Sequence, residues 1–74
     1  MKFKIRLENT NDAQEFVRAA EQCGGDVDLH RGVVYIDGKS LLGILAMGLK
    51  KEMNVSVSDS ASSFKEAVGK FVVA

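Results

Sequence analysis

Two segments of this chain alternate apolar and polar residues with a period of two, and they constrain the fold more than any other feature. Near the N-terminus the apolar positions are Phe3, Ile5 and Leu7, with charged residues between them. Residues 53–58 repeat the pattern as Met-Asn-Val-Ser-Val-Ser. Because successive side chains of a strand point to opposite faces, each segment predicts a β-strand with one buried and one wet face.

Two longer segments repeat apolar residues every three or four positions, as amphipathic helices do. The first has its apolar stripe at Ala13, Phe16, Val17 and Ala20. The second has its stripe at Phe64, Ala67, Val68, Phe71 and Val72.

We expect capping boxes to open both helices, because a Ser, Thr, Asn or Asp followed three residues later by Glu or Gln satisfies free N–H groups reciprocally. Asn11 with Gln14, or Asp12 with Glu15, is expected to open the first helix, which ends at Gly24-Gly25. Ser63 with Glu66 is expected to open the last.

Further strands are expected at residues 27–30 and 33–36. Val27 and Leu29 alternate with Asp28 and His30, whereas all four residues of the second segment are apolar or aromatic. The pattern therefore leaves open which parity of residues 33–36 faces inward. With a short helix after Ser40, the expected order is β-α-β-β-α-β-α. This is an α+β fold with a four-stranded antiparallel sheet and three helices on one face.

Composition limits the class of protein. Seventy-four residues predict a single domain spanning 1–74 with one small core. The ten basic and ten acidic residues balance, which gives no electrostatic basis for nucleic-acid binding. No apolar run approaches the length of a membrane span, so we expect no membrane partner. Cys23 is the only cysteine, so no internal disulfide forms, which fits a reducing cytoplasm.

The run from Asp37 to Leu49 is the most specific local signal. Ser40 stands before an almost wholly apolar segment, where its hydroxyl predicts a helix N-cap. A helix start offers free N–H groups and a positive dipole end, so a phosphate on Ser40 would be favoured there. Gly48 is expected to end this helix.

This run resembles the region around the regulatory serine of the HPr family, the phosphocarriers of the bacterial sugar phosphotransferase system. The block Gly38-Lys39-Ser40-Leu41-Leu42-Gly43 carries the resemblance, together with Gly48-Leu49 and the expected order of elements. The resemblance implies an open-faced β-sandwich of four strands and three helices, the HPr-like fold.

The catalytic loop of that family departs in this chain. The family motif reads glycine, aliphatic, histidine, alanine, arginine, proline, alanine, and here residues 7–13 read Leu-Glu-Asn-Thr-Asn-Asp-Ala. Asn9 takes the position of the phosphorylated histidine and Asn11 that of the arginine, so we expect no catalytic residue here. An amide nitrogen is no nucleophile, and Glu8 and Asp12 would repel a phosphoryl group.

The remaining chemistry-bearing residues are expected to be structural. His30 is the only histidine, on a strand predicted to lie away from the start of the first helix. Asp26, Asp28 and His30 share a strand face, but ligands along one flat strand do not converge, so we expect no metal site. Cys23 lies near a helix C-terminus, where the dipole disfavours a thiolate.

The Ser40 helix has apolar residues on more than one face, which exceeds what a single buried stripe uses. The family resemblance implies that Leu41, Leu42 and Leu45 form a surface that binds protein partners, and that Ser40 is the target of a serine kinase. The alternative is that neighbouring loops or the last helix cover these leucines.

The resulting functional expectation is a non-enzymatic regulatory or adaptor protein without histidine phosphoryl transfer and without a cofactor. Its partners are expected to be proteins: components of the phosphotransferase system, a serine kinase or a transcription regulator. A phosphocarrier role and a scaffold that has lost signalling are the alternatives.

Overall fold

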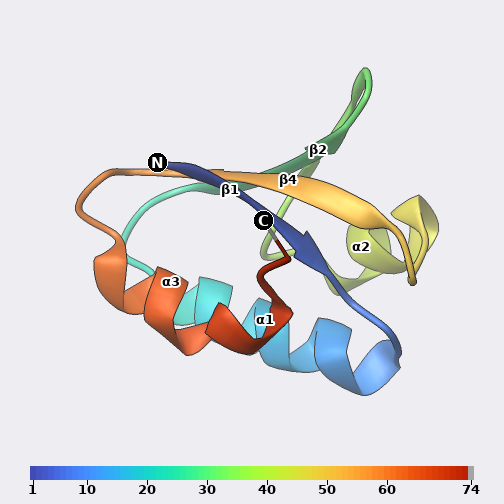
Figure 1. Cartoon of the computed structure of the whole chain (residues 1–74), viewed down its shortest axis with the longest axis horizontal. Coiled ribbons are helices and arrows are strands. Elements are labelled where there is room, and N and C mark those ends of the chain that lie inside the picture. Colours follow the sequence, from blue (N-terminus) through green and yellow to red (C-terminus); the bar gives the residue numbers. More distant parts are fainter. Residues whose placement is uncertain (74) are drawn as a thin grey trace.

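The computed structural model describes residues 1–73, which form a four-stranded antiparallel sheet covered on one face by helices (Figure 1). The element order β-α-β-β-α-β-α expected from the sequence is confirmed, with one 3₁₀ turn added at the end. The strands are β1 (Lys2–Arg6), β2 (Val27–Arg31), β3 (Val34–Asp37) and β4 (Glu52–Val57). The helices are α1 (Thr10–Gln22), α2 (Leu41–Met47), α3 (Ser62–Ala67) and the 3₁₀ turn η1 (Gly69–Phe71).

The sheet order is β1-β4-β2-β3, so β4 pairs with both β1 and β2, and β1 and β3 are the outer strands. The register places Phe3 opposite Val55 and Val55 opposite Leu29, all buried on the helix side. The row beside it joins Lys4, Asn54, His30 and Tyr35 across the open face. The apolar residues of β1 and β4 therefore face the core, and the polar residues between them face the open side of the sheet, as predicted.

The register also settles the parity of β3, which the sequence pattern left open. Ile36 pairs with the buried Leu29 and is half-buried, whereas Tyr35 pairs with His30 and lies exposed on the open face. Val34 shares the helix side with Ile36 but remains about half exposed, because the hairpin extends beyond the helix layer (Figure 1).

The core lies between the sheet and the helices. Phe16 of α1 and Phe64 of α3 meet edge to face, with ring centroids 5.6 Å apart. In α1, Ala13, Phe16 and Ala20 are buried and Val17 is half-buried, which confirms the predicted stripe.

The last helix differs from its prediction. Phe64, Val68 and Phe71 are buried as expected, but Ala67 is exposed. The α-helix stops at Ala67 and tightens into η1 at Gly69, a residue that disfavours helix.

The predicted Ser63–Glu66 capping box is wrong. The helix begins at Ser62, two residues before the start that a Ser63 N-cap would give, so Ser63 lies inside the first turn. The N-cap is Ala61, which forms no side-chain cap and is instead buried in the core.

The C-terminal segment closes one edge of the sheet. Val72 forms an isolated antiparallel bridge with Ile5, and the N–H of Val73 donates to the carbonyl of Lys4 at 3.0 Å. The outer side of β1 is thus paired, whereas β3 is the terminal strand at the opposite edge.

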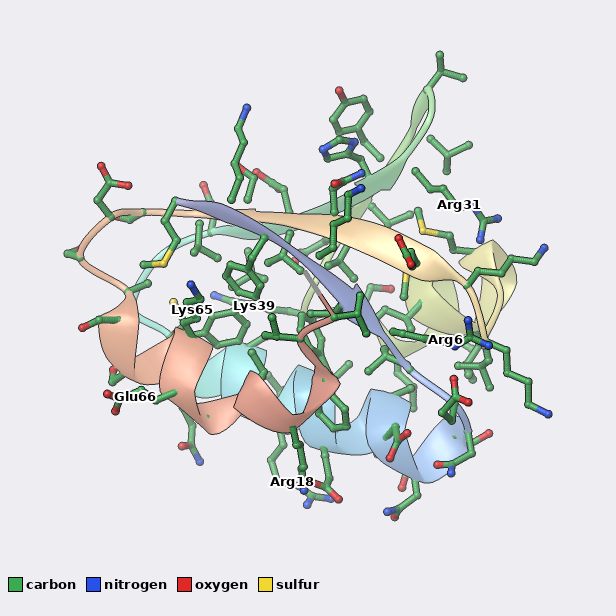
Figure 2. All side chains as sticks on the ribbon, in the orientation of Figure 1. Arg6, Arg18, Arg31, Lys39, Lys65 and Glu66 are labelled. Atoms are coloured by element: carbon green, nitrogen blue, oxygen red, sulfur yellow. The ribbon has the colours of Figure 1, made fainter. Side chains whose placement is uncertain are left out.

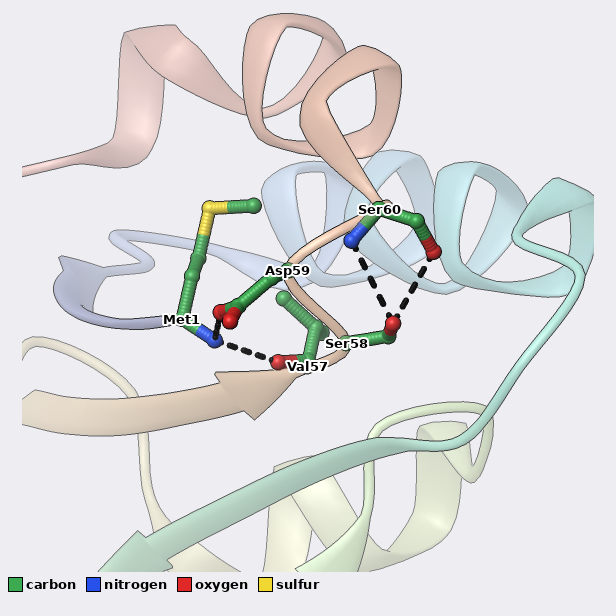
Figure 3. Close-up of polar contacts among 5 residues, drawn as sticks. All are labelled: Met1, Val57, Ser58, Asp59 and Ser60. Carbon is green, nitrogen blue, oxygen red and sulfur yellow. Dashed lines mark hydrogen bonds and ion pairs between the residues drawn. The ribbon is translucent and has the colours of Figure 1, made fainter.

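The N-terminal end of β1 lies beside a small polar cluster (Figure 3). The Met1 ammonium donates to the carbonyl of Val57 at 2.6 Å and to the Asp59 carboxylate at 2.7 Å. Both the hydrogen bond and the charge of the ammonium lower the pKa of Asp59 below its usual value. Ser58 and Ser60 share a hydroxyl–hydroxyl contact of 2.9 Å in the turn that follows.

Within residues 1–73, no helix is long and apolar enough to cross a membrane.

Candidate functional site

Two side-chain hydrogen bonds close the N-terminus of α1. Asn9 has an extended backbone, and its Oδ1 accepts a hydrogen bond from the Asp12 N–H at 2.9 Å. The Asp12 carboxylate in turn accepts from the Glu8 N–H at 3.0 Å. Asn9 is therefore the N-cap, and its amide oxygen occupies one of the free N–H groups at the helix start.

The capping boxes predicted for this helix are wrong. The helix begins at Thr10, so Asn11 and Asp12 lie within the first turn and neither can act as its N-cap. The Asn11 amide instead donates to the Glu15 carboxylate at 3.4 Å on the helix surface.

Three carboxylates lie around this helix start, and two of them are paired with cations. Glu8 pairs with Arg6 at 2.6 Å, and Glu15 pairs with Lys70. The Asp12 carboxylate lies in the first turn, where the helix dipole stabilises a negative charge. A phosphoryl group placed beside Asn9 would meet the negative charge of the Asp12 carboxylate.

Ser40 caps α2, as the sequence predicts. Its Oγ accepts from the Gly43 N–H at 3.1 Å, and its carbonyl accepts from the Ile44 N–H at 3.1 Å. The loop before it is held by Asp37, whose carboxylate accepts from the Lys39 N–H at 2.9 Å. Ser40 is half-buried at the start of the helix.

Glycines allow α2 to lie close to the sheet. A Cβ on Gly38 would stand 2.6 Å from Val27 Cγ1, so no side chain fits there. A Cβ on Gly43 would stand 3.1 Å from Ser40 Oγ and 3.5 Å from Ile36 Cβ. Gly48 ends the helix with a φ of 107°, a backbone conformation that other residues rarely adopt.

The apolar residues of α2 divide between core and surface. Ile44 and Met47 are buried, and the Leu42 side chain is 82% exposed. Leu41 and Leu45 are half-buried and pack against the core. Together Leu41, Leu42 and Leu45 make a surface, called here the α2 leucine surface, in which Leu42 projects furthest.

The family model described as the PTS HPr component phosphorylation site matches residues 8–73. The chain belongs to the HPr family. No curated protein matches its sequence.

Solved HPr structures share the fold at low sequence identity. The histidine-containing phosphocarrier protein of a mycoplasma aligns with a TM-score of 0.75 at 15% identity, over 95% of this chain and 89% of that one. HPr-C-His from Thermoanaerobacter tengcongensis gives 0.74 at 17% identity, over 95% and 85%. The phosphocarrier protein HPr of Bacillus anthracis str. Ames gives 0.69 at 18% identity, over 99% and 96%.

Within this HPr fold, Arg31 has a role that the sequence reading missed. Its Nη2 donates to the carbonyl of Met47 at 2.8 Å, at the C-terminus of α2 (Figure 2). A cation there complements the negative end of the helix dipole. Sequence spacing gave no indication, because the acceptor is a backbone carbonyl sixteen positions away.

His30 lies on the open face of the sheet, the face opposite the helices. Its ring stacks on Tyr35 with centroids 4.8 Å apart, and its Nδ1 has no hydrogen-bond partner among the described residues. Asp28 is exposed on the same strand, whereas Asp26 precedes it. Within residues 1–73, no group of three or more His, Cys, Asp or Glu side chains is arranged to hold a metal ion.

A hollow of about 650 Å³ lies between the C-terminal end of α1 and the start of α3. Its lining includes Cys23, Gly25, Ser58, Ser60 and Phe64, and none of the described residues that line it is charged. Cys23 is half-buried at the C-cap of α1, as its predicted place near a helix C-terminus requires. The hollow therefore offers hydroxyls and apolar surface, but its lining supplies no cation to hold a phosphate.

Proposed function

We propose that this chain is an HPr-type regulatory or adaptor protein that does not carry a phosphoryl group on histidine. It binds protein partners through the α2 leucine surface and is regulated by phosphorylation of Ser40. The chain belongs to the HPr family, but its loop at residues 7–13 lacks the histidine and arginine of the phosphocarriers.

The observation that carries the proposal is the state of Asn9. Aligned through the first helix, Asn9 takes the position of the phosphorylated histidine, and its side chain is the N-cap of α1. Its nitrogen is an amide, whose lone pair is delocalised into the carbonyl, so it cannot accept a phosphoryl group as imidazole does.

The surroundings of Asn9 support the same conclusion. Asn11 replaces the arginine that would hold the phosphate, and its amide contacts Glu15. Glu8 and Asp12 add negative charge beside the loop. Without a charge-assisted donor, a transferred phosphoryl group has nothing to stabilise it here.

Exposure of Leu42 supports the docking role of α2. A large apolar side chain that is 82% exposed gains nothing from folding, whereas it gains free energy when a partner covers it. The half-buried Leu41 and Leu45 extend that contact without leaving the core.

The position of Ser40 supports regulation at the edge of the α2 leucine surface. A phosphoserine carries about −1.5 to −2 charges and three acceptor oxygens. At the N-cap these would meet free N–H groups, with Lys39 adjacent in the chain. Phosphorylation would therefore preserve the fold and change the charge beside Leu42.

The second candidate is a phosphocarrier of the sugar phosphotransferase system, and family membership favours it. It requires a phosphoryl acceptor, and His30 is the only histidine. His30 lies on β2 and stacks on Tyr35, on the face of the sheet opposite α1.

Intact-mass measurement with two phosphoryl donors separates the candidates. With phosphoenolpyruvate and the first enzyme of the system, we expect no phosphorylated product. With ATP and the serine kinase of the family, we expect one phosphoryl group, absent from Ser40→Ala. Stoichiometric transfer from phosphoenolpyruvate would establish the phosphocarrier, and ATP-dependent phosphate retained in Ser40→Ala would exclude Ser40 as the switch.

A further inference from the structure

Because α2 is short, its place on the fold depends on contacts with the rest of the molecule. It has seven residues, and isolated helices shorter than about 12–15 residues are marginal in water. It packs on α1 and on β3, where Gly43 lies close to Ile36. At its N-terminus the Ser40 cap binds the Gly43 N–H, whereas its own last turn contains no basic residue to complement the helix dipole.

Arg31 supplies the missing contact at the C-terminal end. The last carbonyls of a helix have no partner within it, and the Met47 carbonyl accepts a hydrogen bond from Arg31 Nη2 at 2.8 Å. Arg31 ends β2 and is in register with Val34 of β3. Figure 2 shows its side chain between the β2–β3 hairpin and α2. One side chain therefore ties the sheet to the last turn of α2.

This contact has a cost that stability alone does not explain. Arg31 is half-buried, and its Nη1 is buried with no hydrogen-bond partner among the described residues. An unpaired buried donor costs free energy, and an apolar side chain on the helix side of the sheet would avoid that cost. Departures of this kind from local stability are expected at positions that serve function.

The loop after α2 shows a second departure. Lys50 has a φ of 63°, and it is the one non-glycine residue with a positive φ within residues 1–73. Its N–H donates to the carbonyl of Leu7 at 2.7 Å, which holds the loop against the segment before α1. Such a backbone conformation persists where surrounding contacts fix it. The end of α2 and the loop that follows are therefore restrained at two points, Met47 and Lys50.

We propose that Arg31 is a positioning residue for the α2 leucine surface. By fixing the last turn of α2 to β2, it holds Leu42 and Leu45 in one orientation before a partner binds. A preorganised surface loses less conformational freedom on binding, so the affinity rises without a new contact. This inference rests on the proposed docking role of α2 and adds a residue that lies outside that helix.

NMR measurements on Arg31→Met and Arg31→Lys test the fixing of α2 without any partner. Methionine keeps the apolar stem and removes the donor, whereas lysine keeps a charged donor. In Arg31→Met we expect the backbone order parameters of the last turn to fall below about 0.85, the value of a rigid backbone. The residual dipolar couplings of α2 should no longer fit its wild-type orientation. Arg31→Lys should keep both measurements near those of the wild type.

Arg18→Met is the matched control. Arg18 is exposed on α1, away from α2 (Figure 2), and the same group is removed there. Its order parameters and couplings in α2 should equal those of the wild type. Should Arg31→Met not fold, Arg31→Leu is measured in its place.

Affinity for a partner supplies the second measurement. With the purified first enzyme of the phosphotransferase system as the probe, Arg31→Met should bind about threefold or more weakly than the wild type. Arg31→Lys should bind nearly as the wild type does.

The two measurements fail separately. An α2 that is unchanged in Arg31→Met would overturn the positioning role, and weaker binding with an unchanged α2 would instead make Arg31 a direct partner contact. A wild-type chain that does not bind the enzyme, or a Leu42→Glu variant that binds as tightly as the wild type, would refute the docking role of α2. The NMR measurements would then still decide whether Arg31 fixes the last turn.

Discussion

At the scale of the residue, Asn9 connects the fold to the proposed loss of phosphoryl transfer. Its Oδ1 is the cap of α1, and the Asp12 carboxylate completes the turn by accepting from Glu8. The Asn9 side chain stabilises the helix start through this hydrogen bond, and its amide nitrogen is not a nucleophile. Asn9 and Asp12 therefore stabilise the start of α1.

The cap has a measurable contribution to stability. Asn9→Ala removes the acceptor for the Asp12 N–H and should lower the free energy of unfolding by about 1 kcal/mol. Asn11→Ala removes only a 3.4 Å surface contact and should change it by less than about 0.5 kcal/mol. Urea denaturation of both variants beside the wild type measures the difference, and equal losses would contradict the assignment of Asn9 as the cap.

The Met1–Asp59 pair predicts a pH dependence of stability. The folded pKa of Asp59 lies below its unfolded value of 3.8, because the terminal ammonium binds the carboxylate. Its contribution is therefore present above about pH 4 and is lost as the pH falls through the lower, folded pKa. Asp59→Asn should be less stable than the wild type at about pH 7, with the gap closing as the pH falls through the lowered, folded pKa of Asp59. A gap that persists unchanged in acid would show that the charge is not the cause.

At the scale of the element, α2 combines a buried and an exposed apolar face. Ile44 belongs to the core, whereas Leu42 stands on the opposite side of the helix surface and is open to solvent. Seven residues, a serine cap and a glycine stop form a short helix whose position is set by tight contacts at Gly38 and Gly43.

Matched substitutions separate the two faces. Ile44→Ala should cost about 2–5 kcal/mol of unfolding free energy, because it leaves a cavity. Leu42→Glu should change stability by less than about 0.5 kcal/mol while weakening binding to any partner that uses α2. Thermal or urea unfolding measures the stability of both variants. The affinity of Leu42→Glu for a purified phosphotransferase-system partner measures the loss of binding. A Leu42→Glu variant that unfolds would place Leu42 in the core and refute the docking role.

Element identity was predictable where one face is buried, and element boundaries were not. The alternation in β1 and β4 and the stripe of α1 follow directly from burial on one side. The start of α1 did not follow, because Asn9, Thr10, Asn11 and Asp12 all favour caps. Tertiary structure selects Asn9, since Leu7 is buried and its carbonyl is bound by the Lys50 N–H at 2.7 Å.

At the scale of the whole molecule, pairing of distant segments determines the surfaces available for function. The C-terminal segment closes β1, the β3 edge stays open, and Arg31 reaches across to Met47. None of these contacts has a local sequence signal, because each joins residues through the fold. The Ser40 cap was predictable, since it depends on a single short helix, whereas the sequence left open whether Leu42 is exposed or covered by its neighbours.

The central claim is that Asn9 ends the phosphocarrier role, and one measurement tests it most directly. The amount of acid-labile phosphate accepted from phosphoenolpyruvate and the first enzyme of the system is compared between the wild type and the double variant Asn9→His/Asn11→Arg. We expect none on the wild type, even at long incubation, and detectable transfer to the introduced imidazole of the double variant. Imidazole and guanidinium supply the acceptor and the donor that the loop lacks. Stoichiometric phosphate on the wild-type chain, at His30 or any other residue, would contradict the claim.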